Sequence, residues 1–126
     1  MIVDRNKDPW VHVVRRANEW DFLIGPKKVV NMSDEEYLRH WGKWLIFGSP
    51  ERMWDLARKL DPFVEAEEVD SAKFTRAPRE GHPDCVMCVY CDDRDRERVW
   101  KILEGLGVER RIWKYDRETL GISLGR

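Results

Sequence analysis

The chain has 126 residues, of which 42% are hydrophobic and 37% charged, and its formal net charge is −1. We expect a single domain over residues 1–126, because domains are commonly about 100–150 residues long, and the composition excludes disordered, collagen-like and low-complexity proteins. No apolar run reaches the roughly 18 residues of a membrane helix and no signal peptide is evident, so we expect a cytoplasmic protein that does not bind membranes. A near-neutral charge gives no long-range attraction to nucleic acid, so any anion site must be local.

Two further features of the composition concern the source of the protein and its charges. The sequence contains no Gln, and acidic and basic residues are interspersed along it, a pattern typical of proteins from thermophilic organisms. Arg outnumbers Lys by 15 to 8, which suits surface ion pairs and planar recognition of phosphate or carboxylate equally well. We therefore expect a thermophilic source, and the composition leaves the role of the Arg residues open.

The first expected element is a short helix over residues 10–17. Asp8 followed by Pro9 is typical of an N-cap and a first helical position. The alternation of Val11 and Val13 would also suit a strand, so a strand stays open as the alternative.

Three elements are expected between residues 27 and 48. Residues 27–31 are a candidate short strand, and the Ser-Asp-Glu-Glu sequence at 33–36 is a capping box that predicts a helix ending at Gly42. The apolar run at 43–47 predicts a central strand, which Gly48 terminates.

A second helix is expected directly after this strand. Ser49 is the expected N-cap, Pro50 the first helical position, and Asp-Pro at 61–62 the end of the helix. An apolar stripe at helical spacing supports the prediction, formed by Met53, Trp54, Ala57 and Leu60. Residues 63–69 and 72–76 are then candidate strands.

The C-terminal part is expected to add strands and one more helix. A polar loop at 77–83 precedes a strand over 85–91. Asp92 or Asp93 then caps a helix whose apolar stripe is Val99, Ile102, Leu103 and Leu106. A hairpin is expected at the C-terminus, with strands at 110–115 and 119–124. This order of elements predicts an α+β domain with one covered sheet face and one open face, where a site is expected.

Three cysteines have a spacing that is also found in metal sites. Cys85, Cys88 and Cys91 form C-x2-C-x2-C, as in some iron–sulfur and zinc proteins. In a strand, however, Cys88 points away from the other two, and only His82 lies near as a fourth ligand. We therefore predict buried structural thiols, with no metal, no disulfide and no cofactor.

Several segments of the chain resemble the basophilic-leukaemia-expressed protein family. They are residues 42–47, 53–54, 88–95, 103–107 and 113–122, with Gly-Lys-Trp and Lys-Tyr-Asp as the most specific pieces. That family has no established function and sometimes carries a phosphothreonine lyase label. The resemblance implies a fold similar to translation initiation factor 4E, which has a curved, mostly antiparallel sheet, helices on its convex side and a concave ligand face.

The same resemblance raises the question of cap binding. In the initiation factor, a methylated guanine lies between two Trp rings, a carboxylate binds its edge, and Arg and Lys bind the phosphates. The second ring would correspond here to about Asp34, which is not aromatic. Trp41 or Trp20 would have to take its place.

The leading hypothesis is a non-catalytic module that binds an anionic ligand on the concave sheet face. The ligand would be a nucleotide, an RNA end or a phosphopeptide, because clustered cations and hydroxyls form strong, charge-assisted hydrogen bonds with phosphate. A Trp on a strand could add a base-stacking surface. The candidate ligand-binding residues are Lys43, Lys73, Arg76, Lys114, Tyr115, Thr119 and Trp44.

Two alternatives remain open. A phosphothreonine lyase-like enzyme would use a Lys as base and a His as acid, and Lys73 with His82 is the candidate pair, although His12 and His40 are also present. A protein-interaction module would use a Trp-bearing helical surface. The sequence does not distinguish a monomer from an oligomer.

Overall fold

The computed structural model describes residues 1–16 and 26–122. Its centre is a six-stranded sheet in the order β1-β2-β4-β5-β3-β6, in which every neighbouring pair is antiparallel. In this order the strands are Ile2–Val3, Trp10–Val13, Ser71–Thr75, Cys85–Asp92, Trp41–Gly48 and Trp113–Tyr115. The helices are α2 (Lys27–Val30), α3 (Asp34–His40), α4 (Pro50–Glu65), α5 (Arg96–Gly105) and α6 (Asp116–Thr119), and a 3-10 turn (Asp93–Asp95) precedes α5. The α+β prediction is confirmed.

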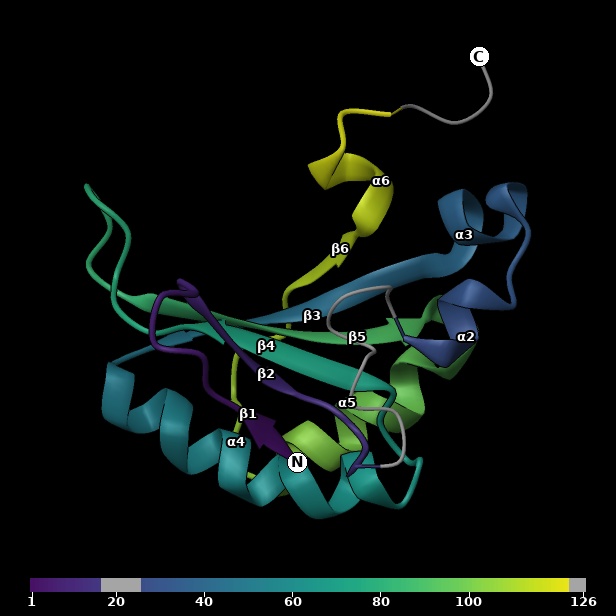
Figure 1. Cartoon of the computed structure of the whole chain (residues 1–126). Helices are drawn as coiled ribbons and strands as arrows, with labels where there is room; N and C mark the ends of the chain where they lie inside the picture. The colour runs from purple at the N-terminus through teal and green to yellow at the C-terminus, as the bar shows by residue number, and fades with distance from the viewer. Residues whose placement is uncertain (17–25, 123–126) are drawn as a thin grey trace.

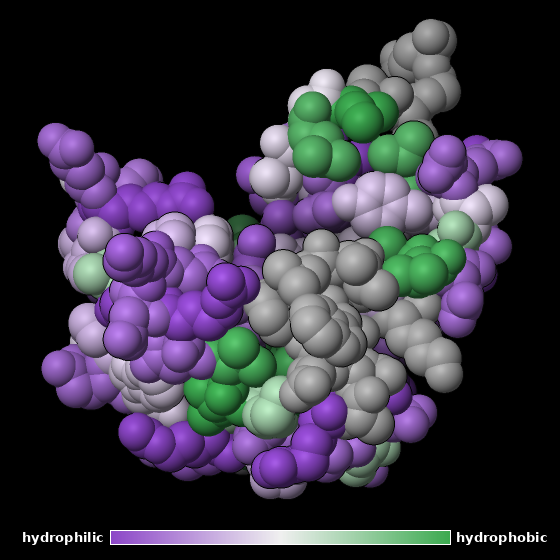
Figure 2. All heavy atoms as spheres, viewed as in Figure 1, coloured by the Kyte–Doolittle hydropathy of each residue, from purple (hydrophilic) through white to green (hydrophobic). Residues whose placement is uncertain are grey.

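The two long helices cover one face of the sheet. Figure 1 shows α4 and α5 beneath the strands, with α2 and α3 at one end and α6 above the opposite face. Figure 2 shows that the molecule is hollowed on this opposite side, between the part that carries the β4–β5 loop and the part that carries α6. Within the described ranges, no helix is long and apolar enough to cross a bilayer.

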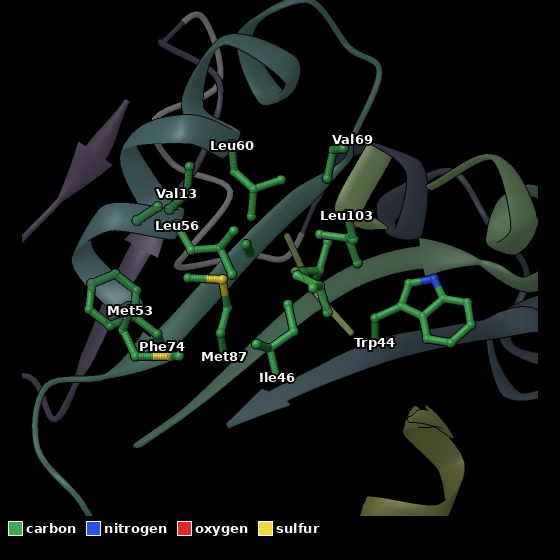
Figure 3. Close-up of a cluster of buried hydrophobic side chains, with 14 of the residues drawn as sticks. Val13, Trp44, Ile46, Met53, Leu56, Leu60, Val69, Phe74, Met87 and Leu103 are labelled. Carbon is green, nitrogen blue, oxygen red and sulfur yellow. The ribbon is translucent and has the colours of Figure 1, made fainter. Parts of the chain in front are cut away.

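The hydrophobic core lies between the sheet and the two long helices (Figure 3). Alternate strand residues point into it because successive side chains of a strand face opposite sides. The largest fully buried contributions include Phe74, Met87, Met53, Leu56, Leu60 and Leu103. Cys85 and Cys91 belong to this core, whereas Cys88 does not. The predicted alternation of the three thiols is therefore confirmed.

The residues that alternate with the core positions form the opposite surface, here called the open face. Cross-strand partners share a face of the sheet, and the register pairs His12 with Lys73, Lys73 with Cys88, and Lys43 with both Tyr90 and Lys114. The open face therefore brings basic residues from four strands to one side of the molecule.

Local capping signals predicted the starts of α3 and α4 correctly. Ser33 Oγ accepts a hydrogen bond from the Glu36 amide at 3.1 Å, and Ser49 Oγ accepts one from the Arg52 amide at 3.1 Å. The Ser33 cap begins helix α3, which ends at His40 rather than at Gly42. The strands predicted at 43–47, 72–76 and 85–91 correspond to β3, β4 and β5, and the helix predicted after Asp93 corresponds to α5.

The N-terminal predictions were wrong in two places. Residues 10–13 form strand β2 rather than the expected helix, which confirms the alternative left open by the alternation of Val11 and Val13: both are completely buried against the core, and the strand pairs with β4. Asp8 does accept a hydrogen bond from the Trp10 amide at 2.8 Å, but it caps a turn before a strand. The segment at 27–30 is helix α2, not the expected strand. Residues 17–25, including Trp20, lie outside the described residues.

Two other boundaries differ from the prediction. Helix α4 continues through Pro62 to Glu65, where Val64 is fully buried and the Ala66 amide donates to the Pro62 carbonyl. The strand predicted over 63–69 does not form, because residues 63–65 are helical and residues 66–69 form turns and a bend. At the C-terminus, β6 pairs with β3 instead of forming a hairpin. Helix α6 follows directly, and the Glu118 carboxylate accepts the Tyr115 amide at 2.9 Å, which favours a helix start there. Residues 123–124 lie outside the described part.

Candidate functional site

A small hollow on the open face lies where β2, β4, β5 and β3 meet α3 and α6. Its volume is about 230 Å³. The polar side of its lining consists of His12, Tyr37, Ser71, Lys73, Tyr90 and Asp116, and Trp41 is among the apolar residues. We call it the Lys73 hollow. These residues are far apart in the sequence, and the sheet brings them together.

Lys73 differs from Lys43 in having no ion-pair partner among the described residues, although the charge of Asp116 acts on it from a distance. Its Nζ lies 4.2 Å from the centre of the Trp10 ring and 6.0 Å from that of Tyr90. No carboxylate of the described residues forms an ion pair with it. Burial lowers the pKa of Lys73, and the positive charge of nearby Lys43 acts in the same direction. An unpaired, partly desolvated ammonium is suited to binding an anion.

His12 lies beside Lys73 on the neighbouring strand. The two residues are direct register partners, and His12 Nε2 lies 3.2 Å from Asp8 Oδ2. Burial lowers the pKa of His12, and the Asp8 carboxylate opposes that effect. The sequence offered His82 as the partner of Lys73, but His82 lines a different hollow, near Lys114 and Arg79.

The lowered pKa of His12 gives a pH dependence of stability. The unfolded chain takes up a proton near pH 6.5, the ordinary histidine value, while folded His12 resists protonation. The free energy of unfolding should therefore fall as the pH drops below 6.5, and less steeply in His12→Gln. Urea unfolding at a series of pH values measures this, with His82→Gln at an exposed loop position as the matched control. Equal slopes in wild type and His12→Gln would contradict the prediction.

Lys43, in contrast, is already neutralised by the protein. It is only 6% exposed, and its Nζ donates to Asp116 Oδ1 at 3.0 Å and to Thr119 Oγ1 at 2.8 Å. The Tyr37 hydroxyl donates to the other oxygen of Asp116, and burial raises the pKa of Tyr37. Lys43 and Thr119 are thus hydrogen-bonded to each other, and Asp116 connects Lys43 to the hollow, although neither residue is part of its lining.

The aromatic rings beside the hollow do not form an open clamp. Trp41 is 2% exposed and stacks on Tyr90, with 6.2 Å between ring centres and 10° between ring planes. Burial also raises the pKa of Tyr90, so its hydroxyl stays protonated. Trp41 therefore does not offer a free ring face for a base, and Trp20 is not among the described residues.

Trp44 is a correction to the predicted site. It belongs to the core face, is 2% exposed, and packs on Trp100 and Trp113 at 5.2 Å between ring centres in each pair. Its indole N–H donates to the Arg96 carbonyl at 3.1 Å. The position after Lys43 in a strand faces the opposite side, so Trp44 cannot reach a ligand on the open face.

Three other predicted residues also lie away from the Lys73 hollow. Arg76 is held at the N-terminal segment by an ion pair with Asp4 and by backbone carbonyls. Tyr115 contacts the Trp113 ring edge-on, and its hydroxyl donates to Asp93 at 2.8 Å. Lys114 lines a second hollow.

Residues important for the hollow were missed at the sequence level. Trp10 and His12 were expected on a helix, and the alternation of Val11 and Val13 was the signal that could have placed them on one strand face. Asp116 carried no local signal for its role, because its partner Lys43 is 73 positions away.

A group of metal-ligand side chains lies at the end of β5. The ligand atoms of His40, Asp92 and Asp93 are within 4.8 Å of one another. Each carboxylate already has protein partners: Arg94 binds Asp92, and Asp93 Oδ1 lies 2.9 Å from His40 Nδ1. These ion pairs account for the cluster, so we assign no metal to it.

Comparisons with known proteins give no match. No protein-family model fits the sequence, and a search of curated proteins finds no significant relative. The resemblance to the basophilic-leukaemia-expressed protein family therefore stays a prediction, and the function must be argued from the site.

Proposed function

We propose that this protein binds a small anionic ligand, carrying a phosphate or carboxylate group, in the Lys73 hollow. The observation that supports this most strongly is the ammonium of Lys73, which is partly buried on the open face without a carboxylate partner among the described residues. The neighbouring Lys43 is neutralised by Asp116, so the same surface contains a cation with a partner and a cation without one.

The partly buried charge of Lys73 lowers the free energy of unfolding when no ligand is bound. Burial disfavours the charged form of Lys73, as its lowered pKa indicates. A bound anion would supply the missing charge and form charge-assisted hydrogen bonds. Residues that are costly for folding and perturbed in pKa are concentrated at functional sites, which favours a binding role over a purely structural one.

The size of the hollow limits the ligand. About 230 Å³ is below the roughly 300–1,000 Å³ of pockets for drug-sized ligands. A phosphate or carboxylate with a few further atoms fits this space, as at a nucleotide or RNA end or on a phosphorylated side chain. Binding on one sheet face of an initiation-factor-4E-like fold is part of the same proposal.

Lys73→Met tests the proposal directly. We expect it to abolish ligand binding, because the cation is lost, while the unfolding midpoint is no lower than in wild type. The second expectation follows from the lowered pKa of Lys73, since below pH 10.5 the folded state disfavours its charged form. Binding is measured by Trp fluorescence during titration with inorganic phosphate, GTP, 7-methyl-GTP and a phosphothreonine peptide.

The matched control is Lys101→Met, which removes a charge from the exposed side of α5. It should bind every probe as wild type does. If none of the four probes changes the wild-type fluorescence or its unfolding midpoint, the proposal is wrong. If a probe binds equally well to Lys73→Met, the site lies elsewhere.

The pairing of Lys73 with His12 favours one enzyme activity as a second candidate, a phosphothreonine lyase. A lowered pKa makes a neutral Lys73 amine more accessible as a base. The amine would take the α-proton, the released electron pair would form the Cα–Cβ double bond, and the Cβ–O bond would break. The departing phosphate oxygen would take its proton from the imidazolium form of His12, which Asp8 favours and burial disfavours. An alkene product from a phosphothreonine peptide supports this reaction, and no product at high enzyme concentration contradicts it.

A further inference from the structure

The open face contains a second hollow that the proposed function does not use. It lies between the β4–β5 loop and β6, on the side where Figure 2 shows the molecule to be hollowed, and its volume is about 550 Å³. Its lining includes Phe47, Arg79, His82, Asp84, Arg110 and Lys114. We call it the basic groove.

The charges of the basic groove are strongly unbalanced. Arg79, Arg110 and Lys114 form no ion pair with any carboxylate in the described part of the chain, and Asp84 is the acidic residue of the lining. Three permanent cations against one carboxylate give a local excess of positive charge, although the whole chain has a formal charge of −1. A local patch of this kind attracts a polyanion without making the protein basic overall.

An exposed aromatic ring lies among these cations. Phe47 is 47% exposed, and it is the aromatic residue among the large hydrophobic side chains that are exposed in the described ranges. It projects from the end of β3, opposite Val86 of β5, on the open face. A single exposed apolar ring is common on protein surfaces, but one that lines the same groove as three cations can also serve as a stacking surface for a base.

We propose that the basic groove binds single-stranded nucleic acid, with a base stacked on Phe47 and phosphates bound by Arg79, Arg110 and Lys114. Positively charged grooves with aromatic platforms are the general means of binding single strands. An acidic peptide would use the cations but would gain no stacking contact from Phe47. The proposal goes beyond the Lys73 hollow and does not depend on it.

One ring contacts a cation from each hollow. The Trp10 indole has Lys73 Nζ 4.2 Å from its centre and the Arg79 guanidinium carbon 5.4 Å from it. Arg79 is also part of the basic groove. A strand in the groove would therefore pass close to the Lys73 hollow, so a terminal phosphate could occupy that hollow while the chain occupies the groove.

The test uses a fluorescently labelled oligouridylate and measures its anisotropy at low salt. Wild type should bind saturably, and Arg110→Ala/Lys114→Ala should weaken binding at least tenfold. The control Arg58→Ala/Lys59→Ala removes the same charge from exposed positions of α4 and should bind as wild type does. With three phosphate contacts, the logarithm of the affinity should fall with the logarithm of salt concentration with a slope of about −2.

Phe47→Leu separates stacking from charge. It keeps an apolar side chain and should weaken oligouridylate binding about fivefold or more, because the base loses its ring. An acidic peptide of equal charge is the competing probe. No oligouridylate binding at low salt, binding that is unaffected by Arg110→Ala/Lys114→Ala, or peptide binding as tight as that of RNA with no effect of Phe47→Leu would each overturn the proposal. Inorganic phosphate binding by Arg110→Ala/Lys114→Ala reports on the Lys73 hollow alone, because neither residue lines it, so the two proposals fail separately.

Discussion

Asp116→Ala is expected to lower the free energy of unfolding by about 3–5 kcal/mol, the cost of leaving a buried charge without its partner. The Lys43 ammonium is 6% exposed and lies 3.0 Å from Asp116 Oδ1. Removing the carboxylate also removes the acceptor of the Tyr37 hydroxyl. Urea unfolding followed by circular dichroism measures the loss.

The reason for this loss can be tested with a second substitution. Lys43→Met/Asp116→Ala should recover much of the stability, because an apolar side chain of similar size needs no counter-charge. Asp55→Ala is the matched control: it breaks the exposed pair between Asp55 and Lys59 and should cost less than about 1 kcal/mol. A double variant that is no more stable than Asp116→Ala would show that the charge is not the cause.

Gly42→Ala is expected to destabilise the protein by about 3 kcal/mol, at the upper end of the usual cost of overpacking. A Cβ at this position would lie 2.3 Å from Cζ2 of Trp113 and 2.9 Å from the Lys114 carbonyl oxygen. Backbone and a large ring cannot both move away, because β3 pairs with β6 at this position. Thermal unfolding measures the effect.

Gly105→Ala is the control for this substitution. Gly105 is the last residue of α5, and nothing lies within 4 Å of an added Cβ. Alanine should stabilise the helix there by up to about 1 kcal/mol. Gly42→Ala/Trp113→Ala provides a second check, since removing the ring should recover part of the loss that Gly42→Ala causes. An unfolding midpoint of Gly42→Ala equal to that of wild type would contradict the close approach of β3 and β6.

The parts of the fold that depend on neighbouring residues were predictable from sequence. Ser33 and Ser49 cap helices because the acceptor and the amide are three residues apart. The segment at 10–13 was not predictable in the same way, because its conformation depends on pairing with β4, about 60 positions later in the chain. The helix end predicted at Pro62 was wrong for a similar reason, because the burial of Val64 favours continuing the helix.

The candidate site was predictable in part. Lys43, Lys73 and Thr119 were expected on one surface, and the structure places them near one another. The sequence did not show which of the two lysines is neutralised, because that depends on where α6 places Asp116. Nor did it show that Lys114, although it is the cross-strand partner of Lys43, lines another hollow.

Both edges of the sheet are short. β1 has two residues and β6 has three, although the strands between them reach eight residues. An edge strand exposes unpaired backbone groups on which another chain can add a strand, and short edges are a way of limiting this. The long strands β3 and β5 pair with each other along their whole length, and β6 pairs with residues 42–44 on the other side of β3. We therefore expect the folded protein to resist fibril formation at high concentration, since neither edge offers a long template for it.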